Sequence, residues 1–408
     1  MLEMIVLLLN SDLVAPVYAS VILSAYLLGV YQLMKKRRIG INFITYPGFW
    51  LLFLSGILFA VSYPKFLNYS LFVCLVLYGI EPLLLYGSGC VVALMTRNDC
   101  GEKILKILYA IAIGCGINVV LSIIANLGVD RWHTVNFWGM RMAATNLAST
   151  NTYIFSLLPC IMITKNKKLK LIGFLLFGLS VVYSFILGTR TQLFLCVIVV
   201  CLSAIAYFIS HYKGRIPSQK TIKLLFAFAG LILVFLVAFG SNFLGIRDKI
   251  LQSNLLYRFI DKDTSGSDYY RMGLFFQGIQ NLVIHPFGGN TDTVYFHNYW
   301  LDIGRVAGVT AVLLVAAYDC IIMVHVIKIF KNRQIKEELR FAFLFLHIGL
   351  FLNFFMEPIM EGYLSILFRS FFLNGIVEGL YYDTHKSNDL PSKYAFTRKY
   401  RRKGVDNK

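Results

Sequence analysis

The sequence predicts an all-α polytopic membrane protein of about eleven transmembrane helices, with one larger external loop that carries an interfacial amphipathic helix. Its 408 residues are 58% hydrophobic and only 15% charged, and the mean hydropathy is +0.67. Apolar stretches long enough to cross a bilayer recur along almost the whole chain. This composition excludes a soluble globular protein. We expect one membrane domain over residues 1–382 and a basic cytoplasmic tail over residues 383–408.

The predicted spans are separated by short connections, apart from one long interruption. A helix needs about 20 apolar residues to cross the hydrocarbon layer of a membrane. Residues 244–303 form the longest excursion from apolar sequence, and we expect them to form the external loop that carries the chemistry. The spans are expected at 14–34, 43–62, 69–94, 104–127, 147–164, 171–187, 192–210, 223–243, 304–328, 341–360 and 363–382.

The distribution of positive charge predicts the orientation of these spans. The chain has 39 Lys and Arg residues against 21 Asp and Glu residues, which gives a formal net charge of +18. Lys and Arg accumulate on the cytoplasmic side of membrane proteins. Placing the basic clusters there puts the N-terminus and the 244–303 loop outside. The clusters lie at 35–38, 97–106, 165–170, 213–223, 328–340 and in the tail.

The basic tail has two interpretations, contact with anionic lipids or enforcement of the topology. Both are typical of a polybasic segment that directly follows a membrane span. Neither requires nucleic acid, so we expect membrane lipids and no nucleic acid as partners. The first span lacks a basic segment before it and a small-residue cleavage site after it, so no cleavable signal peptide is expected.

The third span contains an unusual pair, Glu81-Pro82. A carboxylate inside a membrane is a candidate for function. Beside a proline kink, however, it can also satisfy freed backbone groups or contact a neighbouring helix. Both interpretations stay open from the sequence.

Two arginines are expected at the outer ends of spans. Arg141 follows an aromatic loop with Trp132 and Trp138, where it is a candidate for a sugar-phosphate contact, although tryptophans at such boundaries commonly anchor the membrane interface. Arg190 lies in a turn of two or three residues between spans. A cation held there by two helices is placed for a phosphate at headgroup depth, whereas a structural role would have it extend to lipid headgroups.

The 244–303 loop contains an amphipathic helix that we expect to lie in the membrane interface. The residue before a proline is forced out of the α-helical region, so the pair His285-Pro286 should end this helix. Gly288 and Gly289 can then supply turn geometry with positive φ. The polar face carries Gln277, Gln280 and Asn281, and the apolar face carries Met272, Phe275, Phe276, Ile279, Leu282 and Val283.

A new helix should begin near His297 and continue into the span at 304–328. His297 and Asn298 would then lie at a helix N-terminus, where free N–H groups and the helix dipole favour an anion. The same dipole lowers the pKa of a histidine, so His297 is expected to be neutral and able to accept a proton. The structural alternative is an N-capping or interfacial residue. His285 lies in the turn, and we expect it to be structural.

Glu357 and Glu361 lie at the outer end of the next-to-last span, and Arg369 lies about two turns into the last one. At 1.5 Å per residue, Arg369 would be roughly 10 Å below the outer face. A cation there needs a carboxylate or an aqueous cavity. We expect Glu357 or Glu361 to pair with Arg369, and lining of a substrate cavity is the alternative.

These segments together resemble the O-antigen polymerase and O-antigen ligase superfamily of bacterial membrane glycosyltransferases. The resemblance covers roughly the C-terminal two-thirds of the chain, while residues 1–130 agree only as a set of hydrophobic spans. The usual Gly-Asn-Pro-Asn run of the family is absent after Arg141. The similar segments are Arg141 to Asn151, Gly188-Thr189-Arg190-Thr191, Arg271, His285-Pro286-Phe287-Gly288, His297-Asn298 with Leu301, and Gly304 to Gly308.

The resemblance implies a GT-C-like membrane glycosyltransferase in the bacterial cytoplasmic (inner) membrane, with its active site on the periplasmic face. Such an enzyme polymerises the repeat units of O-antigen, capsule or exopolysaccharide. It transfers a glycan from undecaprenyl diphosphate to a lipid-linked repeat unit. Donor and acceptor are therefore undecaprenyl-diphosphate-linked oligosaccharides, and a chain-length regulator protein is an expected partner.

The resemblance also implies roles for particular residues. Arg190 and Arg271 would stabilise the departing diphosphate, and His297 would act as the general base. No cofactor and no metal are expected, because Asp261-Lys262-Asp263 has no adjacent ligand and arginines can supply the positive charge. Substrate binding is expected from Arg141, Asn298, Asp302, Glu357 and Arg369.

Two other functions remain as alternatives. An O-antigen ligase would use the same donor with lipid A-core as its acceptor. A non-enzymatic transporter of lipid-linked sugars would have charges along its spans and, in many cases, paired repeats. Neither transporter feature is apparent in the sequence.

Overall fold

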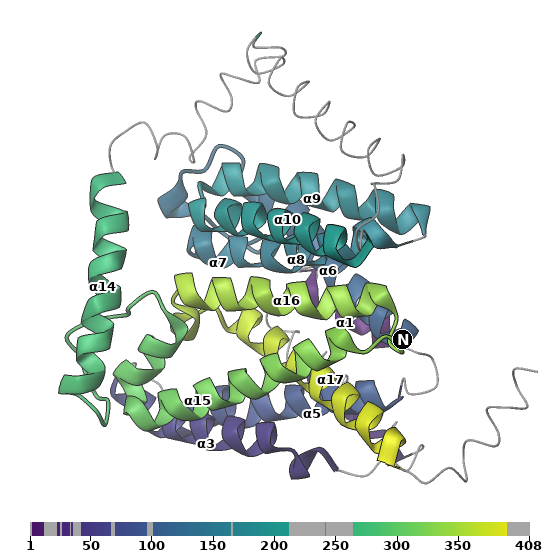
Figure 1. The fold of residues 1–408 in the computed structure, drawn as a ribbon. Helices are drawn as coiled ribbons and strands as arrows, with labels where there is room; N and C mark the ends of the chain where they lie inside the picture. Colours follow the sequence, from purple (N-terminus) through teal and green to yellow (C-terminus); the bar gives the residue numbers. More distant parts are fainter. Residues whose placement is uncertain are drawn as a thin grey trace, which may run out of the picture.

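The protein is all-helical in the computed structural model, which describes residues 2–11, 23–24, 27–32, 34–35, 42–66, 70–95, 101–164, 166–211, 241 and 264–389. Most helices run side by side in one bundle, and α14 stands apart at one end (Figure 1). No strand forms in the described ranges, where the one pairing of β type is an isolated bridge between Val135 and Arg141.

The described helices follow the apolar segments closely. Several of them are short pieces joined without a loop, as in the third span. The helices are α1 (Leu2–Asn10), α3 (Pro47–Ser62), α4 (Leu71–Cys74), the π-helix η3 (Leu75–Ile80), α5 (Glu81–Met95), α6 (Glu102–Asn126), α7 (Ala144–Ser149), α8 (Asn151–Ile163), α9 (Lys167–Leu187), α10 (Arg190–His211), α14 (Thr264–Ile284), α15 (Tyr299–Lys331), α16 (Glu337–Met356), the 3₁₀-helix η7 (Ile359–Glu361) and α17 (Leu364–Asp389).

Seven helices of the described part are long and apolar enough to cross a membrane, and they coincide with seven of the predicted spans. The predicted span 147–164 is divided between α7 and the 13-residue α8. The span 192–210 is helical in α10, whose apolar part is short, Arg190–Leu202. The span 223–243, apart from Ser241, and most of 14–34 lie outside the described residues. The helix α1 was not expected, because its nine residues are too few for a span.

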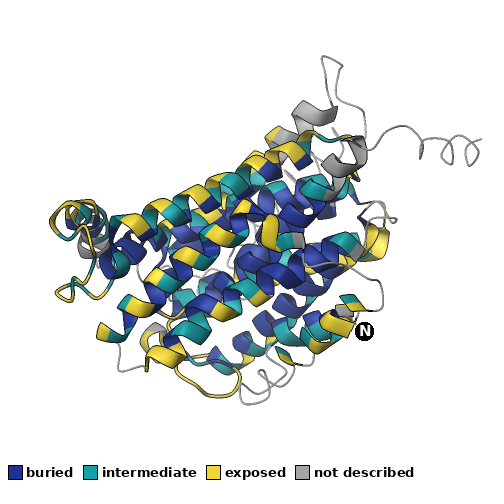
Figure 2. Cartoon of the chain, turned by 90° about the horizontal axis from the view of Figure 1, so that it is seen from below, coloured by how far each residue is buried: buried dark blue, intermediate teal, exposed yellow. Residues whose placement is uncertain are grey.

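The outward surfaces of the bundle are apolar, as the membrane environment requires. On α9, the exposed residues Leu171, Leu175 and Val182 form one stripe, while Ser180 and Ser184 are buried. This arrangement is the reverse of a soluble amphipathic helix, which turns its polar side to the solvent. Figure 2 shows the buried residues concentrated in the middle of the bundle.

Glycines let α5 and α17 approach each other closely. A Cβ atom on Gly375 would lie 1.9 Å from the carbonyl oxygen of Tyr86, and one on Gly379 would lie 2.9 Å from that of Cys90. From the first contact to the second, the residue number rises by four on both helices, from Tyr86 to Cys90 and from Gly375 to Gly379. The two helices therefore run parallel. Small residues at such spacing permit backbone contact between membrane helices.

The bundle has two distinct ends. At one end Lys336 forms an ion pair with Glu102 at 3.2 Å, and Lys328 donates a hydrogen bond to Tyr381 at 2.9 Å. The described part of the first basic segment, residues 101–106, and the segment 328–340 therefore lie at the same end, as predicted. At the other end Asn146 donates to the carbonyl oxygen of Gly362, and the segments around Arg190, Arg271 and Glu357 also gather there.

The helix α14 lies across this second end, nearly perpendicular to α9, α10 and α16 (Figure 1). It ends at Ile284, directly before His285-Pro286, as predicted. Its outward stripe is the exposed set Met272, Phe276, Ile279 and Val283, all from the expected apolar face. Such a helix suits the membrane interface, with its axis in the membrane plane. Asn281, expected on the polar face, is buried instead, and its side-chain oxygen accepts a hydrogen bond from the Asn290 amide.

Candidate functional site

The turn after α14 is docked against a break in α15. Gly288 and Gly289 have φ values of +75° and +86°, as predicted for this turn. Gly308 has φ +81° and ψ −177° and interrupts α15. Its neighbour Val309 donates a backbone hydrogen bond to Pro286 at 2.9 Å. A Cβ on Gly308 would lie 2.3 Å from the Pro286 carbonyl oxygen, so only glycine fits this contact.

Asn298 and Asp302 shape the segment that carries His297. Asn298 is the N-cap of α15, and its side chain accepts a hydrogen bond from the Leu301 backbone at 3.1 Å. Its amide donates to the Phe355 carbonyl at 3.2 Å. Asp302 is fully buried and accepts from the Phe296 backbone at 2.6 Å. Both residues were expected to bind substrate, and the structure gives each a local role in folding this segment.

Arg271 is the centre of the site. Its Nη1 donates to the hydroxyl of Thr191 at 3.3 Å and lies 3.9 Å from the carboxylate of Glu357. The Glu357 side chain is completely buried, whereas that of Arg271 is 25% exposed. The guanidinium therefore has a neutralising carboxylate behind it and an open side. Both contacts use Nη1, so Nη2 and Nε form no hydrogen bond with the described residues and can donate to a ligand.

His297 lies beside Arg271 in a strained conformation. Its φ of +54° is the one positive value for a non-glycine residue in the described part of the chain, and such strain is concentrated at functional sites. Burial, followed by the positive charge of Arg271, lowers the pKa of His297 to about 4. The imidazole is therefore neutral at neutral pH, as predicted. The cause is different, because the residue precedes the N-cap Asn298 and the decisive effects are burial and Arg271.

Two tyrosines, Tyr295 and Tyr363, lie near His297 and Arg271. The ring of Tyr295 meets that of His297 edge to face, with the centroids 4.6 Å apart. Burial raises the pKa of Tyr363, and the negative charge of Glu357 raises it further. The Tyr363 hydroxyl is also hydrogen-bonded to Thr145. Thr145 lies in the segment Arg141 to Asn151 that resembles the family, but the sequence gave no signal for Thr145 itself or for Tyr363.

Arg190 is the first residue of α10, and Gly188 caps the preceding α9 with φ +65°. The turn between the helices is therefore as short as predicted. It places the half-buried Arg190 next to Thr191, whose hydroxyl contacts Arg271. Thr191 is thus the physical link between the Gly188-Thr189-Arg190-Thr191 segment and the site.

Arg141 lies in the loop between α6 and α7. It is exposed, and its guanidinium donates to the Trp132 carbonyl at 2.9 Å. Among the described residues, no hydrogen bond or ion pair joins it to Arg271 or Glu357. The structure therefore does not bring Arg141 into the cluster around Arg271, although it belongs to the same end of the bundle.

Arg369 has a different environment from the one expected. The predicted partner Glu357 pairs with Arg271 instead, and the side chain of Glu361 lies outside the described set. The Arg369 guanidinium lies over the Tyr153 ring at 5.4 Å and lines a cavity of about 440 Å³. The expected pairing with Glu357 is wrong, because α16 ends with Glu357 turned toward α14.

No group of three or more His, Cys, Asp or Glu residues that could hold a metal occurs in the described ranges. The segment Asp261-Lys262-Asp263 lies outside them, so metal independence stays a prediction. Neither a protein-family model nor a curated protein matches this chain. The chemistry of the site is thus the main basis for a functional proposal.

Proposed function

We propose that this protein is a bacterial membrane glycosyltransferase that polymerises polysaccharide repeat units. The donor is a glycan on undecaprenyl diphosphate, and the acceptor is a lipid-linked repeat unit. The site would face the periplasm, as the charge distribution favours. An O-antigen ligase with lipid A-core as acceptor is the second candidate, and the same donor site would serve both.

The observation that carries this proposal is the cluster of Arg271, Glu357 and Thr191 beside the neutral His297. Arg271 comes from α14, Glu357 caps the end of α16, Thr191 comes from α10, and His297 precedes α15. Arginine binds phosphate oxygens through two parallel N–H groups. Arg271 has two nitrogens without partners among the described residues, at the end of the bundle where a lipid diphosphate would be located.

The proposed reaction is a displacement at the anomeric carbon of the donor sugar. The acceptor hydroxyl oxygen forms the new glycosidic bond, and its proton passes to His297. The bond between the anomeric carbon and the diphosphate oxygen breaks, and its electron pair stays on the diphosphate. Arg271 and Arg190 would stabilise this negative charge. The products are the extended glycan on its lipid and free undecaprenyl diphosphate.

Glu357 keeps Arg271 in place for this role. A buried carboxylate at 3.9 Å limits the movement of the guanidinium without occupying both of its hydrogen-bonding edges. The Glu357 carboxylate also offsets part of the positive charge of Arg271 and Arg190 at this end of the bundle. The Arg271 guanidinium, held in place, can then stabilise the negative charge that develops on the diphosphate without having to move first.

Deletion of the gene followed by glycan profiling tests the proposal and separates the alternatives. Surface glycans limited to single repeats indicate a polymerase. Long lipid-linked chains that never reach the surface acceptor indicate a ligase. Repeat units confined to the cytoplasmic face indicate a transporter and would contradict the proposal. Complementation with wild type must restore the profile.

A further inference from the structure

The cavity beside Arg369 is separate from the cluster around Arg271. It has a volume of about 440 Å³ and lies among α1, α5, α6 and α17. Most of its wall is apolar, with Leu85 and Phe372 among the lining residues. The polar groups are few: Asn10, Glu81, Ser365 and Arg369. Pockets of this size and character accommodate small molecules or part of an amphiphile.

Glu81 and Arg369 lie at a similar depth in the bundle. Gly375 packs against Tyr86 in the parallel pair α17 and α5. Glu81 comes five residues before Tyr86, and Arg369 comes six before Gly375. Arg369 also lies five residues after the start of α17, or about 8 Å below it at 1.5 Å per residue. Both charges therefore lie inside the membrane-spanning part of the bundle, and Arg369 is nearer to the end that carries Arg271.

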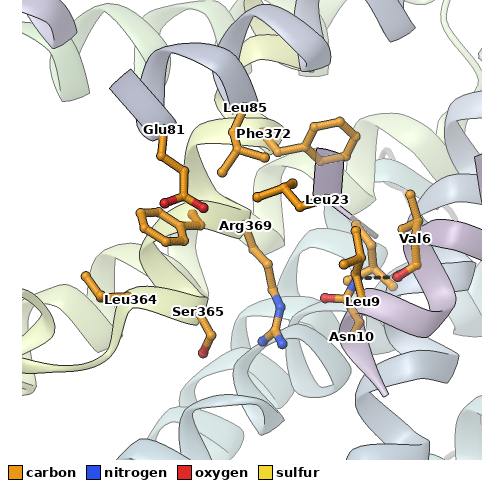
Figure 3. Close-up of a pocket in the computed structure, with 12 residues that line it drawn as sticks. Val6, Leu9, Asn10, Leu23, Glu81, Leu85, Leu364, Ser365, Arg369 and Phe372 are labelled. Carbon is orange, nitrogen blue, oxygen red and sulfur yellow. Dashed lines mark hydrogen bonds between the residues drawn. The ribbon is translucent and has the colours of Figure 1, made fainter. Parts of the chain in front are cut away.

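Neither charge is neutralised by an ion pair with a described residue, and the two are not paired with each other within 4 Å. Figure 3 shows the Arg369 guanidinium extending between Ser365 and Asn10, away from Glu81. One of its nitrogens, Nη1, is buried without a hydrogen-bond partner in the described part of the chain, as is Oδ1 of Asn10. Charged groups at membrane depth are costly unless a partner or water compensates them.

The backbone before Glu81 is also irregular. Residues Leu75–Ile80 form a π-helical turn, and the Glu81 N–H is bonded to the Val76 carbonyl. Pro82 has no N–H, and the freed Tyr78 carbonyl approaches Gly56 so closely that a Cβ there would lie 2.4 Å away. π-Helical turns inside α-helices occur frequently at functional sites. Here the turn sets the direction from which Glu81 meets the cavity.

We propose that this cavity binds a zwitterionic phospholipid with a primary ammonium, of the phosphatidylethanolamine type. Its phosphate is held by Arg369 with Ser365, and its ammonium by Glu81. The separated charges complement a headgroup that carries one charge of each sign, and a primary ammonium can donate hydrogen bonds to the carboxylate. The apolar wall receives the hydrocarbon next to the headgroup. This site is independent of the proposed glycosyl transfer.

Lipid retention by the full-length protein tests this proposal. The protein is purified from vesicles of equal phosphatidylethanolamine and phosphatidylglycerol content, and the bound lipids are counted by native mass spectrometry. The wild type should retain phosphatidylethanolamine in preference by on the order of tenfold, the effect of one charge-assisted contact. Arg333→Gln, an exposed arginine at the opposite end of the bundle, serves as the matched control and should keep this preference.

The two cavity variants should differ from each other. Glu81→Gln should lose the preference and retain both lipids, because only the ammonium contact is removed. Arg369→Gln should retain neither. Loss of the preference in Glu81→Gln protein that still binds both lipids cannot come from unfolding. Equal retention of both lipids by the wild type, or no retained phospholipid, would overturn the proposal.

Discussion

Arg271 and His297 show how two neighbouring residues can perform different tasks. Arg271 remains charged and partly open to a ligand, while its charge and the burial of His297 hold the imidazole neutral. A neutral base beside a fixed cation is suited to a reaction that removes a proton from one group and stabilises negative charge on another. Glu357 and Thr191 hold the cation in position.

Replacement of His297 tests its role as general base. His297→Ala should lower the transfer rate by on the order of 10²- to 10⁴-fold. His285→Ala is the matched control, because His285 lies in the docked turn and should cost much less. Rates of repeat-unit transfer are compared at equal membrane abundance. Near-normal glycan chain lengths with well-expressed His297→Ala protein would reject this role.

The positive charge of Arg271 should lower the measured pKa of His297. The folded pKa of about 4 lies below the ordinary value of 6.5, so protonation at falling pH is opposed. Arg271→Gln should raise this pKa, and added inorganic pyrophosphate should raise it in the wild type by offsetting the cation. NMR titration of labelled histidine measures it, with His297→Ala to assign the signal. An unchanged pKa in Arg271→Gln would show that the two groups do not interact.

Arg271→Lys separates geometry from charge. A lysine keeps the positive charge but lacks the planar fork that binds two phosphate oxygens. We expect most transfer activity to be lost, and Arg190→Lys should behave similarly. Activity at equal membrane abundance is the readout, and Lys331→Arg at the opposite end serves as a control. Activity close to wild type in both lysine variants would mean that a point charge is sufficient.

At the scale of elements, the docked turn determines where α14 stands. Gly308 adopts φ +81° and ψ −177°, a conformation open almost only to glycine, and its break in α15 receives the backbone of Pro286. Gly288 makes the reciprocal approach, with its missing Cβ 2.4 Å from the Val306 carbonyl oxygen. These contacts attach α14, which carries Arg271, to α15, which follows His297.

Gly308→Ala should weaken this attachment. The backbone conformation alone costs roughly 1–3 kcal/mol for a residue with a Cβ, and the Cβ would lie 2.3 Å from Pro286. The apparent melting temperature in detergent should fall and transfer activity should decrease. Gly273→Ala, a position in α14 with nothing within 4 Å of a Cβ, should melt at or above the wild-type temperature. Equal melting of both variants would contradict the docking role.

At the scale of the whole molecule, the bundle separates a basic end from the end with the candidate site. The ion pair between Lys336 and Glu102 joins two basic segments, and the contact of Arg271 with Glu357 lies at the other end. Lys and Arg favour the cytoplasmic side. The end with Arg271 is therefore expected to face outward.

Cysteine labelling tests this orientation. In a cysteine-free background, Val294→Cys at the site end should react with a membrane-impermeant thiol reagent on intact cells. Gln334→Cys at the basic end should react only after permeabilisation. Both positions are exposed in the structure. Labelling of both from one side would overturn the topology, and labelling of Gln334 alone from outside would invert it.

Local features of the site were predictable from the sequence, because short-range chemistry determines them. The proline pair ends α14, glycines adopt positive φ in the turn, and an asparagine caps α15. Apolar length identified seven spans of the described part. The neutral state of His297 was expected for a wrong reason, since proximity to Arg271 depends on packing.

Sequence alone determined an all-helical membrane protein, the ends of its main helices and the side on which its basic segments gather. These properties follow from apolar length, proline and glycine geometry and charge. The tertiary structure alone decided which charges meet: Arg271 with Thr191, 80 positions away, Glu357 with Arg271 rather than Arg369, and Arg369 on a cavity with Glu81. The partner of a charged group depends on how distant helices cross, and close packing at residues such as Gly375 and Gly308 sets those crossings.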